Sequence, residues 1–190
     1  MDFLSSVPVW AWILAVVAII ALWFFSTYNS LVSFRTRVEE AFSGMDVTLT
    51  KRYDLIPNVV NTVKGYAKHE SETLENVIKA RSNAMSATTT EEKIAAQGEL
   101  SQTLGRLFAL SESYPDLKAN QNFMDLQNQL KDIETEIASS RKFYNAVVRS
   151  YNIKVRSIPT NIVAALCHFK EFPPYVVTSE EQRQNVKVEF

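Results

Sequence analysis

The residues that most resemble parts of an active site do not complete one. His69 and Glu70 begin like the HExxH motif of zinc proteases, but Thr73 stands where the second histidine is required. Cys167 and His168 are adjacent, and neighbouring side chains on a helix point about 100° apart, so we expect no catalytic dyad. A small buried thiol is the alternative for Cys167. The sequence therefore predicts no catalytic residue.

Phosphate-binding and metal-binding patterns are also missing. Neither GxxxxGK[ST] nor GxGxxG occurs, and the four glycines are isolated within helical patterns. Two histidines and one cysteine are too few for a transition-metal cluster, and a single cysteine allows no internal disulfide. The formal net charge of -1 argues against a chain built to bind nucleic acid. We expect no metal, no cofactor and no nucleic-acid partner.

One charged motif is a candidate partner surface. Lys51, Arg52, Tyr53 and Asp54 come shortly before Pro57. The motif has three readings: a solvated turn before the proline, a buried ion pair that fixes a kink, or a surface that binds a partner. The sequence alone does not choose among them.

Two tyrosine motifs are further candidates. Tyr144-Asn145 and Tyr151-Asn152 repeat at a seven-residue interval, which places both tyrosines on one helix face and each asparagine beside it. They are either core tyrosines with satisfied hydroxyl groups or a polar ladder between subunits. The segment Tyr114-Pro115-Asp116 interrupts a helical pattern and is a third candidate for a partner-binding surface.

These candidates must be positioned by a chain that begins with an apolar segment. Val9–Phe25 contains no charged residue, and with its extension to Tyr28 it would span roughly 30 Å, the thickness of a bilayer core. Trp10 and Trp12 lie at one end, and Trp23 and Tyr28 at the other, as in the aromatic belts of spanning helices. We predict a single membrane-spanning helix that contacts lipid.

Two alternatives to a span are less consistent with the residues. A cleaved signal peptide carries a basic start and a small-residue cleavage site, whereas this chain starts MDFLSSVP and leaves the apolar segment through bulky aromatics. A buried core helix rarely runs so long without a polar residue. Arg35 and Arg37 follow the span and no Lys or Arg precedes it, so we expect the N-terminus outside and the large domain in the cytoplasm.

The remaining chain shows helical periodicity. The spacing predicts that the spanning helix continues to about Tyr53 and that Pro57 breaks or kinks it. A second segment then starts near Pro57. The third segment is expected from Glu91 to Ser113, with Thr90 as its cap. The fourth is expected from Asn120, its cap, to Val155 with a coiled-coil-like heptad seam.

The predicted fold is all-α: an N-terminal transmembrane helix that continues into an antiparallel bundle of about four long helices. The domains are expected at 1–28 for the N-terminal segment and span, 29–168 for the helical bundle, and 169–190 for an extended C-terminal tail. Pro159 should end the fourth helix, and a short helix or turn is expected at 161–167. The apolar tail residues, Val177 included, would pack on the bundle or on a neighbouring subunit.

The residues resemble the LemA family of bacterial membrane proteins. The resemblance covers about Tyr28 to Phe172 and rests on these segments: Tyr28–Val32, Asp46-Val47, Lys51–Val60, Val63–Ala67, Glu70, Glu112, Tyr114–Asn120, Phe123, Ile137-Ala138, Arg141, Tyr144-Asn145, Val148, Tyr151-Asn152 and Pro159. Thr50 stands where a basic residue is more usual, and the tail is longer. The resemblance implies a bacterial inner-membrane anchor with its N-terminus outside, a bundle of long helices, and no enzymatic activity.

The leading functional hypothesis is a non-enzymatic, membrane-anchored helical bundle that forms homo-oligomers or scaffolds other membrane proteins. The alternative is a sensory or signalling module in which Pro57 is a hinge that transmits movement of the spanning helix. A hydrolase that uses Cys167 or His69 is the third hypothesis.

Overall fold

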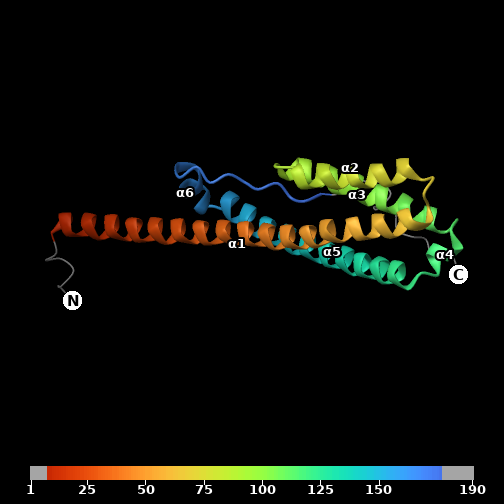
Figure 1. Ribbon diagram of the computed structural model, residues 1–190. Coiled ribbons are helices and arrows are strands. Elements are labelled where there is room, and N and C mark those ends of the chain that lie inside the picture. Colours follow the sequence, from red (N-terminus) through yellow and green to blue (C-terminus); the bar gives the residue numbers. More distant parts are fainter. Residues whose placement is uncertain (1–7, 177–190) are drawn as a thin grey trace, which may run out of the picture. The chain divides into compact units, whose positions relative to one another are not determined.

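The computed structural model describes residues 8–176, which form helices and connecting segments and contain no strand. The helices are α1 (Val9–Tyr66), α2 (Ser71–Ser86), α3 (Thr90–Ser111), α4 (Pro115–Lys118), α5 (Gln121–Arg156) and α6 (Thr160–Leu166), and Figure 1 shows their order. Contacts group the chain into two units. Among the described residues, unit 1 comprises 8–41 and 145–172, and unit 2 comprises 42–144 and 173–176. The predicted all-α fold is confirmed.

Helix α1 starts with the apolar segment. Of the described helices it alone is long and apolar enough to cross a membrane, and none of its apolar window is buried within the protein. Trp10 and Trp12 are 64% and 48% exposed, whereas Trp23 and Tyr28 are 37% and 39% exposed. A surface this apolar is stable only if something other than water covers it. The anchor predicted from the sequence is therefore present as a helix.

The prediction that α1 ends near Tyr53, and that a second helix starts near Pro57, is wrong. α1 continues through Pro57 to Tyr66, and the break comes four residues before α2 starts at Ser71. Proline removes one N–H from the helix interior, but the helix continues where the freed carbonyl finds another donor. In this structure that donor is Arg81 on α2.

In unit 2, the second half of α1 packs with α2, α3 and the first half of α5. α2 and α3 lie side by side (Figure 1). The fully or nearly fully buried apolar residues recur at three- and four-residue intervals on each helix: Met45, Leu49, Tyr53, Ile56, Val60 and Val63 on α1, Leu74, Val77, Ala80 and Ala84 on α2, and Leu100, Leu104 and Leu107 on α3. Burial of these stripes is the main stabilising contribution, at about 25 cal/mol per Å² of apolar surface.

The caps of α3 and α5 test the sequence prediction in detail. Thr89, not Thr90, caps α3: its side chain accepts from the Glu92 N–H, and the Glu92 carboxylate accepts from the Thr89 N–H, which completes a capping box. The prediction was one residue late. Asn120 caps α5 as predicted, because its Oδ1 accepts from the Phe123 N–H at 3.0 Å.

Helix α5 confirms the heptad seam. The residues at seven-residue spacing, Phe123, Leu130, Ile137, Tyr144 and Tyr151, are almost fully buried, and Val148 is buried as well. The intervening seam residues, such as Leu126 and Ile133, are half-buried. This spacing places the tyrosines in line with the aliphatic core residues.

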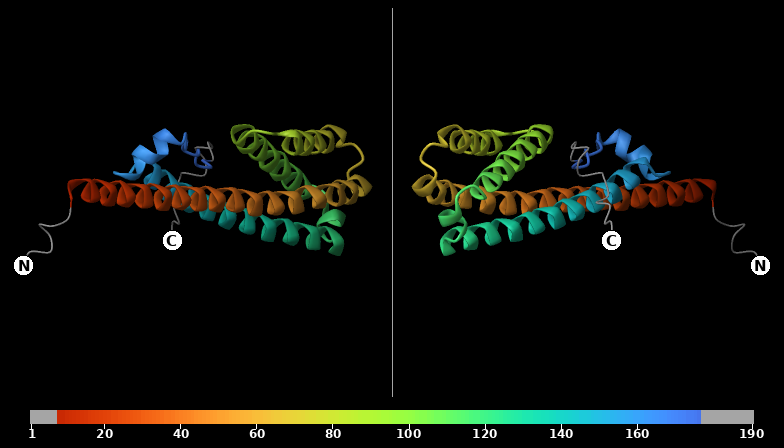
Figure 2. Two further views of the ribbon diagram at one scale, coloured as in Figure 1. Left: turned by 90° about the vertical axis from the view of Figure 1, so that its left-hand side faces the viewer. Right: turned by 90° about the vertical axis from the view of Figure 1, so that its right-hand side faces the viewer.

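In unit 1, α6 packs against α1 (Figure 2). Leu31, Val163 and Ala164 are buried together, and Phe24 and Phe169 are among the side chains that pack on them. The chain leaves α6 through a Schellman turn, in which Phe169 N–H donates to the Ala164 carbonyl. From residue 169 to 176 it has no helix or strand. The rest of the predicted tail, Val177 included, lies outside the described residues.

Candidate functional site

The charged motif on α1 surrounds one buried guanidinium group. Arg52 is 1% exposed. Its Nη1 donates to Gln97 Oε1 at 3.0 Å, and its Nη2 donates to Ser101 Oγ at 2.9 Å. The same Nη2 lies 2.7 Å from Oε1 of Glu134 on α5. The Glu134 side chain is 39% exposed. Arg52 therefore joins α1, α3 and α5 inside unit 2, and it occupies a core position rather than a solvated turn.

Burial dominates the electrostatics of Arg52. Desolvation lowers the pKa of its guanidinium, and the negative charge of Glu134 raises it again in part. The nearby Arg141 lowers it further. The Arg52 Nε atom is buried without a hydrogen-bond partner. Of the three readings of the motif, the solvated turn does not hold for Arg52, whose ion pair with Glu134 has one buried and one half-buried member.

The other charged residues of the motif face outward. Lys51 Nζ lies 3.1 Å from Glu136 Oε2 on α5, and both side chains are more than half exposed. Asp54 is exposed. An exposed ion pair of this kind contributes at most about 1 kcal/mol. The motif thus divides into a buried half and a solvated half.

Pro57 leaves one carbonyl of α1 without its helical donor, that of Tyr53 four residues earlier. Arg81 Nε on α2 donates to this carbonyl oxygen at 2.8 Å. The side chain of Arg81 is half-buried. This contact explains why α1 continues through Pro57. The sequence analysis missed Arg81 because a proline shows which carbonyl lacks a donor but not which distant residue provides one.

The Tyr53 side chain is part of the same network. Its hydroxyl donates to the Ala84 carbonyl and accepts from Gln97 Nε2, the amide whose oxygen binds Arg52. Desolvation, followed by the negative charge of Asp46, raises the pKa of Tyr53 to about 12. Gln97 therefore links Arg52 and Tyr53. The sequence did not predict this link because Gln97 is distant from both residues along the chain.

Tyr114, Pro115 and Asp116 form the start of a short helix. Pro115 occupies the first turn of α4, Asp116 is exposed there, and the Tyr114 hydroxyl donates to Glu70 Oε1 at 3.1 Å. Desolvation and this hydrogen bond both raise the pKa of Tyr114. The hydrogen bond between Tyr114 and Glu70 thus connects the α1–α2 loop to the α3–α4 turn.

The tyrosine–asparagine repeat binds the C-terminal segment of the same chain. In unit 1, the Tyr151 hydroxyl donates to the Lys170 carbonyl at 3.0 Å, and Asn152 both donates to and accepts from the backbone of Phe172 at 2.8 and 3.0 Å. In unit 2, the Tyr144 hydroxyl donates to the Pro173 carbonyl at 3.2 Å.

Asn145, the remaining member of the repeat, is half-buried on α5. Burial raises the pKa of both repeat tyrosines, Tyr144 and Tyr151. The geometry is that of core tyrosines with satisfied hydroxyl groups, one of the two readings open from the sequence.

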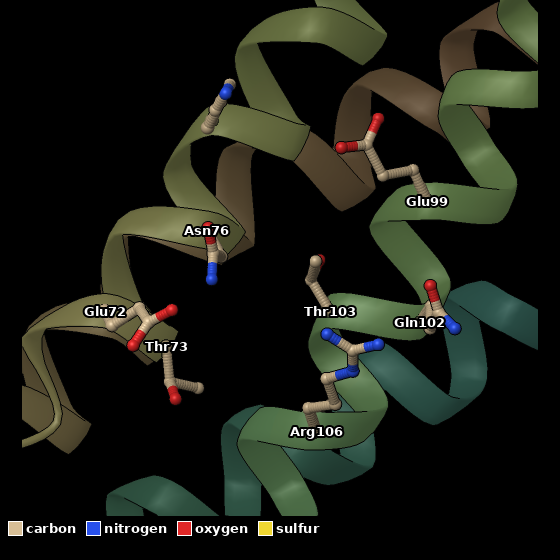
Figure 3. A pocket seen from close by; sticks show the side chains of 8 residues that line it. Glu72, Thr73, Asn76, Glu99, Gln102, Thr103 and Arg106 are labelled. Carbon is tan, nitrogen blue, oxygen red and sulfur yellow. The ribbon is translucent and has the colours of Figure 1, made fainter.

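A polar pocket lies between α2 and α3 (Figure 3). Glu72 from α2 and Arg106 from α3 point into it, near Thr103. Neither a histidine nor a cysteine lines this pocket. Among residues 8–176, no three His, Cys, Asp or Glu side chains lie together in a way that could hold a metal ion.

Comparison with known proteins places this geometry in a family. The profile of the LemA family matches residues 41–190. Magnetosome protein MamQ 2 of Paramagnetospirillum magneticum is 25% identical, over 83% of this chain and 67% of the relative. Protein LemA of Metamycoplasma hominis is 25% identical, over 72% of this chain and 63% of the relative. Magnetosome protein MamQ of Magnetospirillum gryphiswaldense is 23% identical, over 75% of this chain and 62% of the relative.

The matched region contains the Arg52 network, the Pro57–Arg81 contact and the residues that hold the C-terminal segment. For the two relatives with less overlap, this chain spans under two thirds of the relative's length. With its exposed apolar α1 segment, the chain is a membrane-associated helical protein, and it belongs to the LemA family.

Proposed function

We propose that this protein is a non-enzymatic, single-pass membrane protein that self-associates in the plane of the membrane and thereby scaffolds other membrane proteins. The observation that carries the proposal is an apolar surface on one side of the α1–α5 pair in unit 2. Phe143 is 61% exposed and Val47 is 58% exposed. Large apolar side chains exposed together are a common mark of a protein interface.

The helix geometry places these residues on one side of the pair. Glu136 and Phe143 are seven residues apart on α5, so they share a face, and the same holds for Gly44 and Lys51 on α1. The Lys51–Glu136 ion pair joins the two faces. Val47 lies on the turn between Gly44 and Lys51. A Cβ at Gly44 would meet nothing within 4 Å, so the surface of α1 is open at Gly44.

A second copy of the chain is the occupant that we propose for this surface. The span fixes every copy in the same bilayer with the same orientation, which raises the local concentration and aligns identical surfaces. A weak contact then suffices for association. Oligomers built in this way would present many copies of the bundle to other membrane proteins.

Cross-linking in native membranes tests the proposal. The wild-type chain should give a ladder of oligomers, and Phe143→Asp should reduce the ladder to monomer because a carboxylate would be buried at the contact. Met85→Asp is the matched control, since Met85 is a comparably exposed apolar residue on α2, at 54%. A monomer for the wild-type chain at its natural density, or an unchanged ladder for Phe143→Asp, would contradict the proposed surface.

The orientation is part of the same proposal. Arg35 and Arg37 follow the span, so the positive-inside rule favours an external N-terminus and a cytoplasmic bundle. A Ser150→Cys variant in a Cys167→Ser background should react with a membrane-impermeant maleimide only after lysis. Labelling in intact cells would reverse the assignment.

A signalling module is the second candidate. The observation that favours it is the continuity of α1 from the span through Pro57 into the core of unit 2. A movement of the span would then act directly on the helix that carries Arg52. A Pro57→Ala variant with unchanged downstream behaviour would count against a role for the proline as a hinge.

A further inference from the structure

Helix α6 and the turn before it expose an apolar surface. Ile162 and Leu166 lie four residues apart on one face of α6 and are 55% and 66% exposed, and Ile158 in the preceding turn is 85% exposed. The opposite face is the one buried in the protein through Val163 and Ala164. A short helix that is apolar on both faces is stable only when each face is covered by protein or by lipid.

The segment has no charge along its length. Residues 157–167 contain no Asp, Glu, Lys or Arg. Arg156 precedes it and is paired with Glu171, and Lys170 follows it as an exposed basic residue. Such an arrangement is typical of helices that lie in a membrane interface, where long basic side chains reach the headgroups while the apolar face enters the acyl boundary.

The position of α6 agrees with this composition. Its buried face packs on Phe24, near the end of the apolar segment, and on Leu31, which follows that segment on α1; both views in Figure 2 show α6 beside α1. The Phe169 ring after α6 contacts Tyr28 at 5.7 Å between centroids. Tyr28 belongs to the aromatic belt of the span. α6 is therefore fixed where a spanning α1 would leave the bilayer.

The charge of unit 1 suits a membrane with anionic lipids. In residues 29–41 and 145–172, six basic residues outnumber three acidic ones: Arg35, Arg37, Arg149, Lys154, Arg156 and Lys170 against Glu39, Glu40 and Glu171. The whole chain has a formal net charge of -1, so the excess of positive charge is local to this unit. Basic residues near an anionic bilayer surface are attracted to it electrostatically.

We propose that α6 is a second membrane contact, which lies in the lipid headgroup interface with Ile158, Ile162 and Leu166 directed into the acyl boundary. Its occupant is the bilayer surface, enriched in anionic lipid around the basic residues. This contact goes beyond the proposed self-association and does not depend on it. It holds α1 at a fixed depth and limits its tilt, because the anchor then touches the bilayer at two places.

Depth-dependent quenching tests this contact in the full chain. Ile162→Cys in a Cys167→Ser background is labelled with an environment-sensitive fluorophore and reconstituted into phosphatidylcholine vesicles with and without phosphatidylglycerol. A nitroxide near the glycerol backbone of the lipid should quench the label strongly, and iodide in the water should quench it weakly. This pattern corresponds to a depth of about 5–10 Å below the headgroups.

Ser150→Cys in the same background is the matched control, because Ser150 is exposed on α5 within the same unit. Its label should be quenched by iodide and not by the lipid nitroxide. Circular dichroism of each labelled variant establishes that the helices are intact. Stronger lipid quenching of the Ile162 label with phosphatidylglycerol present would support the electrostatic part of the proposal, and equal quenching would overturn that part.

Strong quenching of the Ile162 label by iodide would overturn the membrane contact. Protection from both quenchers would also overturn it, and would show instead that protein covers α6. The cross-linking ladder of the preceding section is read separately, so failure of one proposal does not hide the outcome of the other.

Discussion

Arg81 on α2 donates from Nε to the carbonyl oxygen of Tyr53 at 2.8 Å, and that oxygen is the one that Pro57 deprives of its helical donor. A proline in a helix interior usually kinks or ends the helix, at a cost of about 3 kcal/mol. Here a side chain from another helix replaces the missing donor. α1 can therefore carry the Lys51–Pro57 motif as continuous helix.

This relationship predicts a thermodynamic coupling between Arg81 and Pro57. Arg81→Ala should lower the free energy of unfolding by about 1.5–3 kcal/mol, because it leaves a carbonyl without its charged donor. In a Pro57→Ala background the new N–H can bind the Tyr53 carbonyl, so the cost of Arg81→Ala should fall to under about 1 kcal/mol. Denaturant unfolding in detergent measures all four proteins, with Lys79→Ala as an exposed control on α2. Equal costs in both backgrounds would contradict the coupling.

The buried guanidinium predicts an order among substitutions of Arg52. Arg52→Ala should be the most damaging, at about 3–5 kcal/mol, because it opens a cavity and leaves the buried Gln97 Oε1 without its donor. Arg52→Met should cost less, since it retains most of the volume and Glu134 can be solvated by water. Thermal unfolding followed by circular dichroism gives the order. A harmless Arg52→Ala variant would mean that the network contributes nothing to the bundle.

The alkaline stability of the bundle should depend on Tyr53. Its pKa is raised to about 12 in the folded protein, against about 10 for an ordinary tyrosine. Below pH 10 both states keep the proton, and between pH 10 and 12 only the folded state does. The free energy of unfolding should therefore fall in this window, by up to about 1.4 kcal/mol per pH unit.

Denaturant unfolding of Tyr53→Phe across this pH window measures the contribution. The variant should lose stability less steeply than the wild-type chain as the pH rises from 10 to 12. Asn58→Ala, a change of a non-titrating residue at an exposed position on α1, is the control and should keep the wild-type slope. An unchanged slope for Tyr53→Phe would contradict the assignment to Tyr53.

The end of α6 predicts a stabilising substitution. His168 has φ 58°, in the left-handed region, at the position of the Schellman turn where glycine is usual. His168→Gly should raise the free energy of unfolding by about 1 kcal/mol, and His168→Val should lower it, because a branched side chain opposes this conformation more strongly. Thermal midpoints measure both. A destabilised His168→Gly variant would show that the imidazole has a favourable role of its own.

The attachment of the C-terminal segment predicts a graded loss. Asn152 makes two hydrogen bonds with the Phe172 backbone, one as donor and one as acceptor. The Asn152→Asp variant retains only the acceptor, and the Asn152→Leu variant retains neither group. Limited proteolysis after Lys170 should therefore be slowest in the wild-type chain, faster in Asn152→Asp and fastest in Asn152→Leu. Ser150→Ala is the control on the same helix. Equal cleavage in all variants would mean that other contacts hold the segment.

The sequence by itself determined the helical fold, the apolar span, the limits of α5 and the heptad seam, because each depends on residues that are neighbours along the chain. A charge-free segment predicts a span, and an asparagine before a helix predicts a cap, wherever the rest of the chain lies. The family signature was also evident from residue order alone.

Only the tertiary structure decided where Arg52 points, what replaces the donor that Pro57 lacks, and what the tyrosine–asparagine repeat binds. The local rule for proline predicted a break at Pro57, and it failed because Arg81, distant in sequence, supplies the missing hydrogen bond. Whether a charged residue is buried or solvated likewise depends on partners such as Gln97 and Glu134, which lie on other helices. The packing of distant helices, rather than any local pattern, fixes these contacts.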